Sequence, residues 1–255
     1  MSNESRKIDL GTHAIRVHES GSGARTFVCL HGFLDGTAVW DGVLPGLAAL
    51  GRVVLIQQRA HGDSTAPAGG CTIEDLALDV IKVLDALGVQ RATVIGHGLG
   101  GMVALTAALQ APDRLEALVL ISTVSEIDDR TVAQWRQVVR AGEVNRLQGL
   151  ARSVFGPTSR HEVDGDGISL TEIARALHGF GAQPLTARLS GIRCPTVVLA
   201  GQQDATGVAA ARLIAAQIPG ARLEIVEQQQ DAPHVGAPEP VVAAIRALAS
   251  SLERA

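Results

Sequence analysis

The stretch VIGHGLGG, residues 94–101, predicts a strand that passes through a sharp turn into a helix. Val94 and Ile95 end a β-branched run, four glycines lie in the turn, and residues 102–109 read as helix. A turn of this form exposes the residue at its tip, and the pattern G-x-S-x-G places a catalytic serine there. The tip residue here is Gly98, so the position of the nucleophile is vacant.

The sequence on both sides of this turn alternates between short β-branched runs and helical patterns. This alternation is typical of a mostly parallel α/β sheet with helices on both faces. The expected strands are Ala14–His18, Thr26–Leu30, Val53–Gln57, Ala92–Ile95, Ala117–Ile121, Thr196–Ala200 and Arg222–Val226. The expected helices are Val39–Leu50, Ile73–Leu87, Leu99–Gln110, Val208–Gln217 and Val235–Leu252. The 255 residues suffice for one large α/β domain with a small insertion.

Residues 124–190 interrupt the alternation because they are richer in charge and carry helical patterns at Val132–Arg140 and Leu170–Leu177. We expect this segment to form a helical cap, inserted into a core made of residues 1–123 and 191–255. Such a cap would cover the end of the sheet at which the loops form a site.

The composition narrows the classes of function. The net charge of −4 includes no basic stripe, and aromatic residues make up only 2 % of the chain, which argues against nucleic acid as a partner. Three widely spaced cysteines argue against disulfides and a metal site and favour a reducing cytoplasm. A polar N-terminus and the lack of a long apolar run argue against a signal peptide and a membrane anchor. We expect a small-molecule substrate and no cofactor, and leave a homodimer open.

Five motifs along the chain together resemble the α/β-hydrolase superfamily in order and spacing. They are His31-Gly32-Phe33, Arg59-Ala60-His61-Gly62-Asp63-Ser64, Gly96-His97-Gly98-Leu99-Gly100-Gly101, Ala200-Gly201-Gln202-Gln203-Asp204 and Pro233-His234 followed by Glu239. The resemblance covers nearly the whole chain and implies the α/β-hydrolase fold, with a site at the ends of the central strands.

The resemblance also implies roles for individual residues. His234 would be the general base, and the Asp204 carboxylate would orient its imidazole. The backbone amides of Phe33 and Leu99 would form an oxyanion hole beside Gly98. The alternative for Asp204 is a helix N-cap, and the alternative for His234 is an ordinary loop histidine.

Five further residues are expected around the substrate: His31, His97, Trp135, Phe155 and Phe180. Structural packing is the favoured alternative for the two histidines. For the three aromatic residues a place in the core is about as well supported.

Three hypotheses account for Gly98. The chain is an enzyme without an acyl intermediate, in which His234 and Asp204 drive proton abstraction, elimination, cyclisation or attack by water. It is alternatively a serine-to-glycine variant of an esterase, lactonase or thioesterase, or a non-catalytic protein that binds a ligand. A pure binding protein has no need of Asp204 or His234, so their presence favours chemistry.

Overall fold

The computed structural model describes residues 4–67, 69–143 and 167–254. Its centre is an eight-stranded sheet in the order β1-β2-β4-β3-β5-β6-β7-β8. The strands are β1 (Glu4–Asp9), β2 (Ala14–Ser20), β3 (Thr26–Leu30), β4 (Arg52–Gln57), β5 (Ala92–His97), β6 (Leu115–Ile121), β7 (Thr196–Gly201) and β8 (Arg222–Val226). Strand β2 pairs antiparallel with β1 and β4, and the pairs from β4 to β8 are parallel. The predicted fold class is confirmed.

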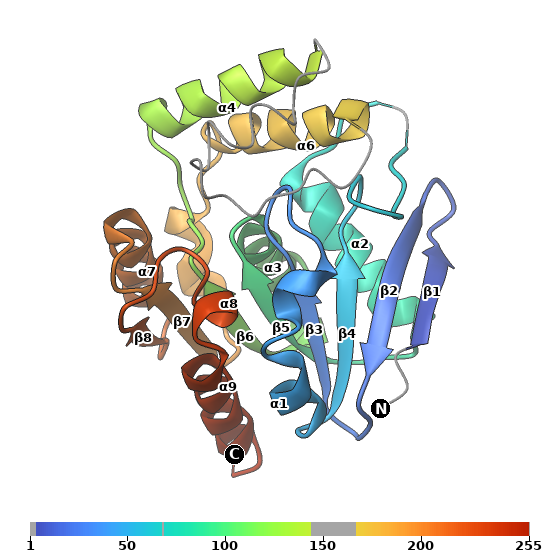
Figure 1. Cartoon of the computed structure of the whole chain (residues 1–255). Coiled ribbons are helices and arrows are strands. Elements are labelled where there is room, and N and C mark those ends of the chain that lie inside the picture. The colour runs from blue at the N-terminus through green and yellow to red at the C-terminus, as the bar shows by residue number, and fades with distance from the viewer. Residues whose placement is uncertain (1–3, 68, 144–166, 255) are drawn as a thin grey trace.

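Helices cover both faces of this sheet (Figure 1). The described α-helices are α1 (Leu44–Ala48), α2 (Ile73–Ala86), α3 (Leu99–Gln110), α4 (Asp129–Glu143), α6 (Gly167–Phe180), α7 (Ala205–Gln217), α8 (Pro233–Gly236) and α9 (Pro238–Leu252). Short 3₁₀ helices are η1 (Thr37–Trp40), η2 (Pro112–Arg114) and η3 (Thr186–Gly191). None of the helices in the described ranges is long and apolar enough to cross a membrane.

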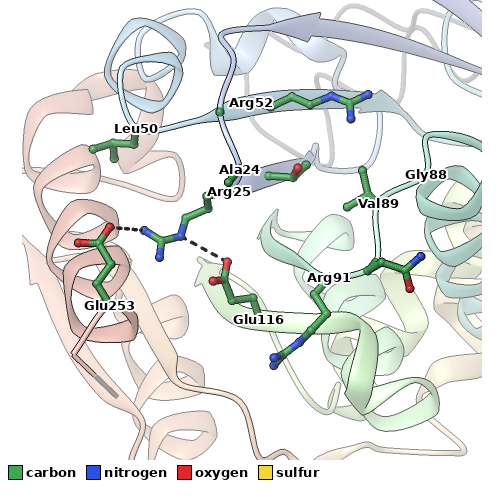
Figure 2. Close-up of a pocket in the computed structure, with 12 residues that line it drawn as sticks. Ala24, Arg25, Leu50, Arg52, Gly88, Val89, Arg91, Glu116 and Glu253 are labelled. Atoms are coloured by element: carbon green, nitrogen blue, oxygen red, sulfur yellow. Dashed lines mark hydrogen bonds and ion pairs between the residues drawn. The ribbon is translucent and has the colours of Figure 1, made fainter.

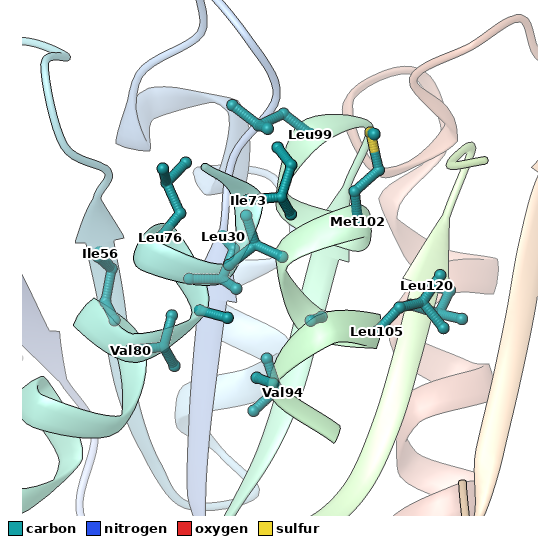
Figure 3. Close-up of a cluster of buried hydrophobic side chains, with 14 of the residues drawn as sticks. Leu30, Ile56, Ile73, Leu76, Val80, Val94, Leu99, Met102, Leu105 and Leu120 are labelled. Carbon is teal, nitrogen blue, oxygen red and sulfur yellow. The ribbon is translucent and has the colours of Figure 1, made fainter. Parts of the chain in front are cut away.

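Strand β3 shows why the central strands are apolar throughout. Val28 and Leu30 pack in the core that residues of α2 and α3 share. Figure 3 shows Leu30 close to Leu76 of α2. Phe27 and Cys29 pack in the second core, against α1 and α9. Because successive side chains of a strand point to opposite faces, a strand covered on both sides needs apolar residues at every position.

Three elements differ from the prediction for local reasons. Strand β1 was not predicted because ESRKID is polar and almost wholly exposed, and it forms by antiparallel pairing at the sheet edge. The helix expected at Val39–Leu50 is divided into η1 and α1, and Pro45 lies in the first turn of α1. The helix expected at Val235–Leu252 is divided at Ala237, which is held out of the helical region before Pro238.

Helices α4 and α6 lie in the segment where a cap is expected. They pack against each other and extend across the top of the molecule, over the carboxyl ends of the central strands (Figure 1). The boundaries 124–190 remain a prediction. Phe155, expected near the substrate, lies outside the described residues.

Candidate active site

The turn between β5 and α3 has a backbone form that suits a glycine at its tip. Gly98 has φ 53° and ψ −115°, a region that favours glycine because other residues carry a Cβ. Its N–H donates to the Ile121 carbonyl at 3.1 Å, and the Thr123 hydroxyl donates to its carbonyl at 2.7 Å. A Cβ added at Gly98 would lie 3.7 Å from Gly32 Cα, an ordinary contact. The turn is therefore anchored, and the space for a side chain is open.

Replacing Gly98 by alanine is expected to lower the free energy of unfolding by about 1–3 kcal/mol. The loss would come from backbone strain, because the added methyl group meets no close atom. Urea denaturation would measure it, with Gly179→Ala in α6 as the control. Gly179 has no positive φ and open space around it, so its replacement should not destabilise the chain. Equal stability of the two variants would contradict strain at Gly98.

A cavity of about 520 Å³ lies over Gly98, at the carboxyl ends of the parallel strands. Its floor includes Gly32, Phe33 and Leu99, and its far wall includes Trp135 of α4. The rings of Phe33 and Trp135 meet edge to face, with centroids 5.2 Å apart. The cavity therefore lies between the turn and α4, and it is partly open to solvent.

Two backbone amides on the cavity floor are the predicted oxyanion-hole donors. Leu99 is the first residue of α3, so its N–H has no acceptor within the helix. Within the described ranges, neither the Leu99 nor the Phe33 amide donates a hydrogen bond to another residue. Both residues line the cavity, and the convergence of their N–H groups on one point remains a prediction.

The predicted pair of His234 and Asp204 is wrong. The Asp204 carboxylate caps α7 by accepting the Gly207 N–H at 2.9 Å, which is its alternative role. Neither ring nitrogen of His234 has a hydrogen-bond partner among the described residues. The reason is the path of the chain: α8 places the ring between Trp40 and His97, at centroid distances of 4.6 and 4.5 Å.

His234 is fully buried and is not among the residues that line the cavity. Burial, and secondarily the neighbouring His97, lower the pKa of His234 well below its ordinary value, so the imidazole is neutral at pH 7. A general-base role that requires His234 to face the cavity is not supported by this arrangement.

Two other buried histidines stabilise the loop that carries Phe33. His31 lies 2.8 Å from the Gly32 carbonyl through Nδ1, and its Nε2 accepts the Gln58 N–H at 3.0 Å. The accepting Nε2 requires the proton to be on Nδ1 in the neutral ring. His61 makes the same pair of bonds, to the Arg59 carbonyl at 3.0 Å and from the Leu34 N–H at 3.1 Å.

Two residues expected at the substrate lie elsewhere. His31 is fully buried beneath the cavity floor, where it supports the loop. Phe180 belongs to the hydrophobic core and is not a lining residue. The expectation for both residues is therefore corrected, because their burial is explained by packing. His97 and Trp135 do line the cavity, and their contact with substrate remains a prediction.

The structure brings His97, one of the expected residues, together with Asp35, which the sequence did not indicate. His97 Nδ1 lies 3.4 Å from Asp35 Oδ2, and both residues line the cavity beside Gly98. His97 Nε2 lies 3.2 Å from the Asp231 carbonyl. The sequence favoured packing for His97 and gave no reason to select Asp35, because no local spacing connects the end of β5 with the loop after β3.

A second hollow, of about 730 Å³, includes residues at the start of β3 and β4 and in the turn before β5 (Figure 2). Arg25 points between two carboxylates there, Glu116 and Glu253, each 3.4 Å away. Arg52 pairs with Glu19. Arg25 and Arg52 are therefore each paired with carboxylates. Within the described ranges, no group of three or more His, Cys, Asp or Glu could hold a metal ion.

The fold and the glycine-rich turn together define the class. Residues 25–155 match the family model of the alpha/beta hydrolase fold, and the chain belongs to that family.

Named relatives differ in activity. The chain is 30 % identical over 225 residues to the dihydrolipoyllysine-residue acetyltransferase component of an acetoin cleaving system from Cupriavidus necator, covering 83 % of this chain and 60 % of that protein. It is 30 % identical over 138 residues to the 2-(acetamidomethylene)succinate hydrolase of Mesorhizobium japonicum, covering 54 % of this chain and 49 % of the relative. The structure of a hydrolase from Pseudomonas aeruginosa superposes with a TM-score of 0.85 at 26 % identity, covering 97 % of this chain and 99 % of the other.

Proposed function

We propose that the chain is an enzyme that acts on a small carbonyl compound without forming an acyl-enzyme intermediate. The observation that carries the proposal is Gly98, which keeps the turn conformation and leaves open space on the cavity floor. A substrate atom can occupy the volume that a serine side chain would fill. The amides of Phe33 and Leu99 then bind the carbonyl oxygen and stabilise the negative charge that develops on it.

The charges around the cavity favour an uncharged substrate. Four carboxylate residues belong to the lining: Asp35, Glu126, Asp128 and Asp231. No arginine or lysine lines it among the residues that the structure describes. A carboxylate or phosphate group on the substrate would be repelled there, because like charges at short range in a partly apolar cavity raise the free energy.

The chemistry compatible with this floor is limited. Proton abstraction next to the carbonyl, elimination, cyclisation and attack by water all develop charge on the carbonyl oxygen and need no serine. A second candidate, ligand binding without turnover, is favoured by one observation: His234 and Asp204 are not hydrogen-bonded to each other.

Replacing Leu99 by proline tests the proposal, because it removes one oxyanion-hole donor and little else from the backbone. Proline is tolerated in the first helical position, where the N–H is not used by the helix. We expect the rate to fall about 10²–10³-fold. The matched control is Leu99→Ala, which truncates the same side chain and keeps the N–H, and which should retain most of the activity.

The assay is deuterium incorporation next to the carbonyl of neutral methyl ketones in D₂O, beginning with acetone and acetophenone and read by ¹H NMR. Equal rates in Leu99→Pro and Leu99→Ala would refute a role for this amide. Ketones that bind in the cavity but never exchange would overturn proton abstraction next to the carbonyl and favour ligand binding. Ketones that neither bind nor exchange would overturn the substrate class.

A further inference from the structure

We propose that the edge of strand β8 is an interaction surface and that its partner is the same edge of a second copy of this chain. Strand β8 ends the sheet opposite β1, and its one described neighbour in the sheet is β7 (Figure 1). An uncovered strand edge presents backbone N–H and C=O groups with which another strand can pair. No residue of β8 lines the cavity over Gly98, so the inference does not depend on the proposed function.

The direction of the backbone groups of β8 follows from one hydrogen bond. The Val226 carbonyl accepts the Gln202 N–H at 2.9 Å, so the polar groups of Val226 face β7. Because successive residues of a strand turn these groups to opposite sides, those of Glu224 also face β7, and those of Leu223 and Ile225 face outward. Among the described residues, no loop or helix forms a backbone hydrogen bond with Leu223 or Ile225. Two N–H donors and two carbonyl acceptors are therefore available along this edge.

The side chains of β8 are incompletely covered on both faces of the sheet. Ile225 is 36 % exposed, whereas the large apolar side chains of the central strands are buried. Leu223, on the same face as Ile225, is half-buried. On the opposite face, the side chains of Arg222 and Glu224 are 49 % and 42 % exposed and lie 3.4 Å apart. One face of the edge is thus apolar, and the other exposes one charge of each sign.

Two antiparallel copies of β8 have one register that suits both faces. With Leu223 opposite Leu223 of the second copy, Arg222 lies opposite Glu224 and Ile225 lies opposite Ala221. Residues opposite each other share a face, so apolar side chains meet on one face and opposite charges meet twice on the other. Moving the symmetry axis by one residue places Glu224 opposite Glu224, or Arg222 opposite Arg222, which is unfavourable. The edge is therefore complementary to itself, as a two-fold symmetric dimer requires.

This register also uses the outward backbone groups. The Leu223 N–H donates to the Leu223 carbonyl of the second copy, and symmetry supplies the reverse bond. The Ile225 N–H donates to the Ala221 carbonyl of the second copy, again twice by symmetry. Strand β8 is 5 residues long, so the contact is smaller than a standard interface, and we expect a weak, reversible dimer.

Strand β1, at the other end of the sheet, does not offer the same complementarity. Its charged residues occupy both faces, with Glu4 and Arg6 on one and Lys7 and Asp9 on the other. A strand added there would cover charges on both sides, and natural sheet edges are commonly protected in this way. The charges of β8 lie on one face only, so the apolar face remains available for a partner.

The first test is sedimentation velocity of the full chain from low micromolar to millimolar concentration, where we expect a monomer–dimer equilibrium. Glu224→Arg should raise the dissociation constant about tenfold, because two pairs of opposite charge become two pairs of like charge. Arg222→Glu should have the same effect for the same reason. The double variant Arg222→Glu/Glu224→Arg exchanges the two charges, keeps both cross-strand pairs and should restore the dimer.

The second test locates the contact by hydrogen exchange of single amides. The Leu223 and Ile225 N–H groups should exchange quickly in dilute samples and become protected as the concentration rises. The Glu224 N–H faces β7 and should be protected at every concentration, so it is an internal control. Leu223→Pro removes an outward N–H, which a strand edge tolerates, and should abolish the dimer. Leu223→Val keeps the N–H and an apolar side chain and is the matched control, and thermal unfolding checks that both variants fold.

Three results would overturn the inference. The first is a chain that stays monomeric at every concentration. The second is a dimer that persists in Leu223→Pro or leaves the Leu223 and Ile225 N–H groups unprotected, because another surface would then join the copies. The third is a double variant that dimerises no better than Glu224→Arg alone, because the charge pairing that selects a second copy would then be absent. The charge variants alter only exposed side chains, so this last result does not depend on the folding of the proline variant.

Discussion

Replacing Asp79 by alanine is expected to lower the free energy of unfolding by about 3–5 kcal/mol. Arg59 donates to both carboxylate oxygens of Asp79, through Nε and Nη2, each at 2.8 Å. His13 Nε2 lies 3.1 Å from the same carboxylate. Asp79 and Arg59 are 5 % and 7 % exposed, so the variant leaves a buried guanidinium without its counter-charge.

The control is Asp85→Ala on the same helix, α2. Asp85 pairs with Arg114 at 2.7 Å, but its side chain is 62 % exposed, and solvent screening limits such a pair to about 1 kcal/mol or less. Urea denaturation at pH 7 would measure both variants. Similar losses for Asp79→Ala and Asp85→Ala would contradict the view that burial makes the first pair indispensable.

Acidification should destabilise the fold strongly because His61 cannot be protonated where it lies. Burial, with a smaller contribution from His31, lowers the pKa of His61 to about 3. An unfolded histidine titrates near pH 6.5, so between these values the unfolded chain binds more protons. The stabilisation is complete above about pH 6.5 and is lost as the pH falls toward 3, which amounts to about 5 kcal/mol at 1.36 kcal/mol per unit.

Denaturation curves recorded from pH 7.5 to 4.5 test this effect as a slope. His61→Gln should reduce the fall in stability by up to about 1.4 kcal/mol per pH unit. The reason is that the unfolded chain then binds one proton fewer on acidification. His234, whose pKa burial also lowers, continues to contribute in that variant. His18→Gln, at a half-buried position, is the control and should change the slope less. An unchanged slope in His61→Gln would show that this histidine is protonated without unfolding.

Much of the fold could be predicted because its signals are local. The strand Thr26–Leu30 and the helix Leu99–Gln110 have the predicted bounds. The apolar run of the strand predicts its bounds, and the glycine-rich turn predicts where the helix begins. Strand β1 could not be predicted, because polar residues pair there only when β2 supplies a partner. Helix α8 ends at Ala237 because a proline follows, and that proline is visible in the sequence. The prediction gave more weight to the helical pattern of residues 235–252 and therefore missed the break.

The residues of the site also divide into those that one local motif predicts and those that depend on how distant loops meet. Gly98 and Leu99 lie in one motif, and their places on the cavity floor follow from that turn. The pairing of His234 with Asp204 depends on how two separate loops meet, and the loops bring His234 to His97 instead. Asp35 was missed for the same reason, because its partner comes from another strand.

The bare turn at Gly98 has an electrical consequence. Helix α3 contains 12 residues, has no acidic residue in its first turn, and begins at the cavity floor. Its aligned peptide dipoles place roughly half a positive charge at that end. With a serine at the tip, a hydroxyl oxygen would stand in this field. Without one, this field acts directly on the space over Gly98, where it favours negative charge.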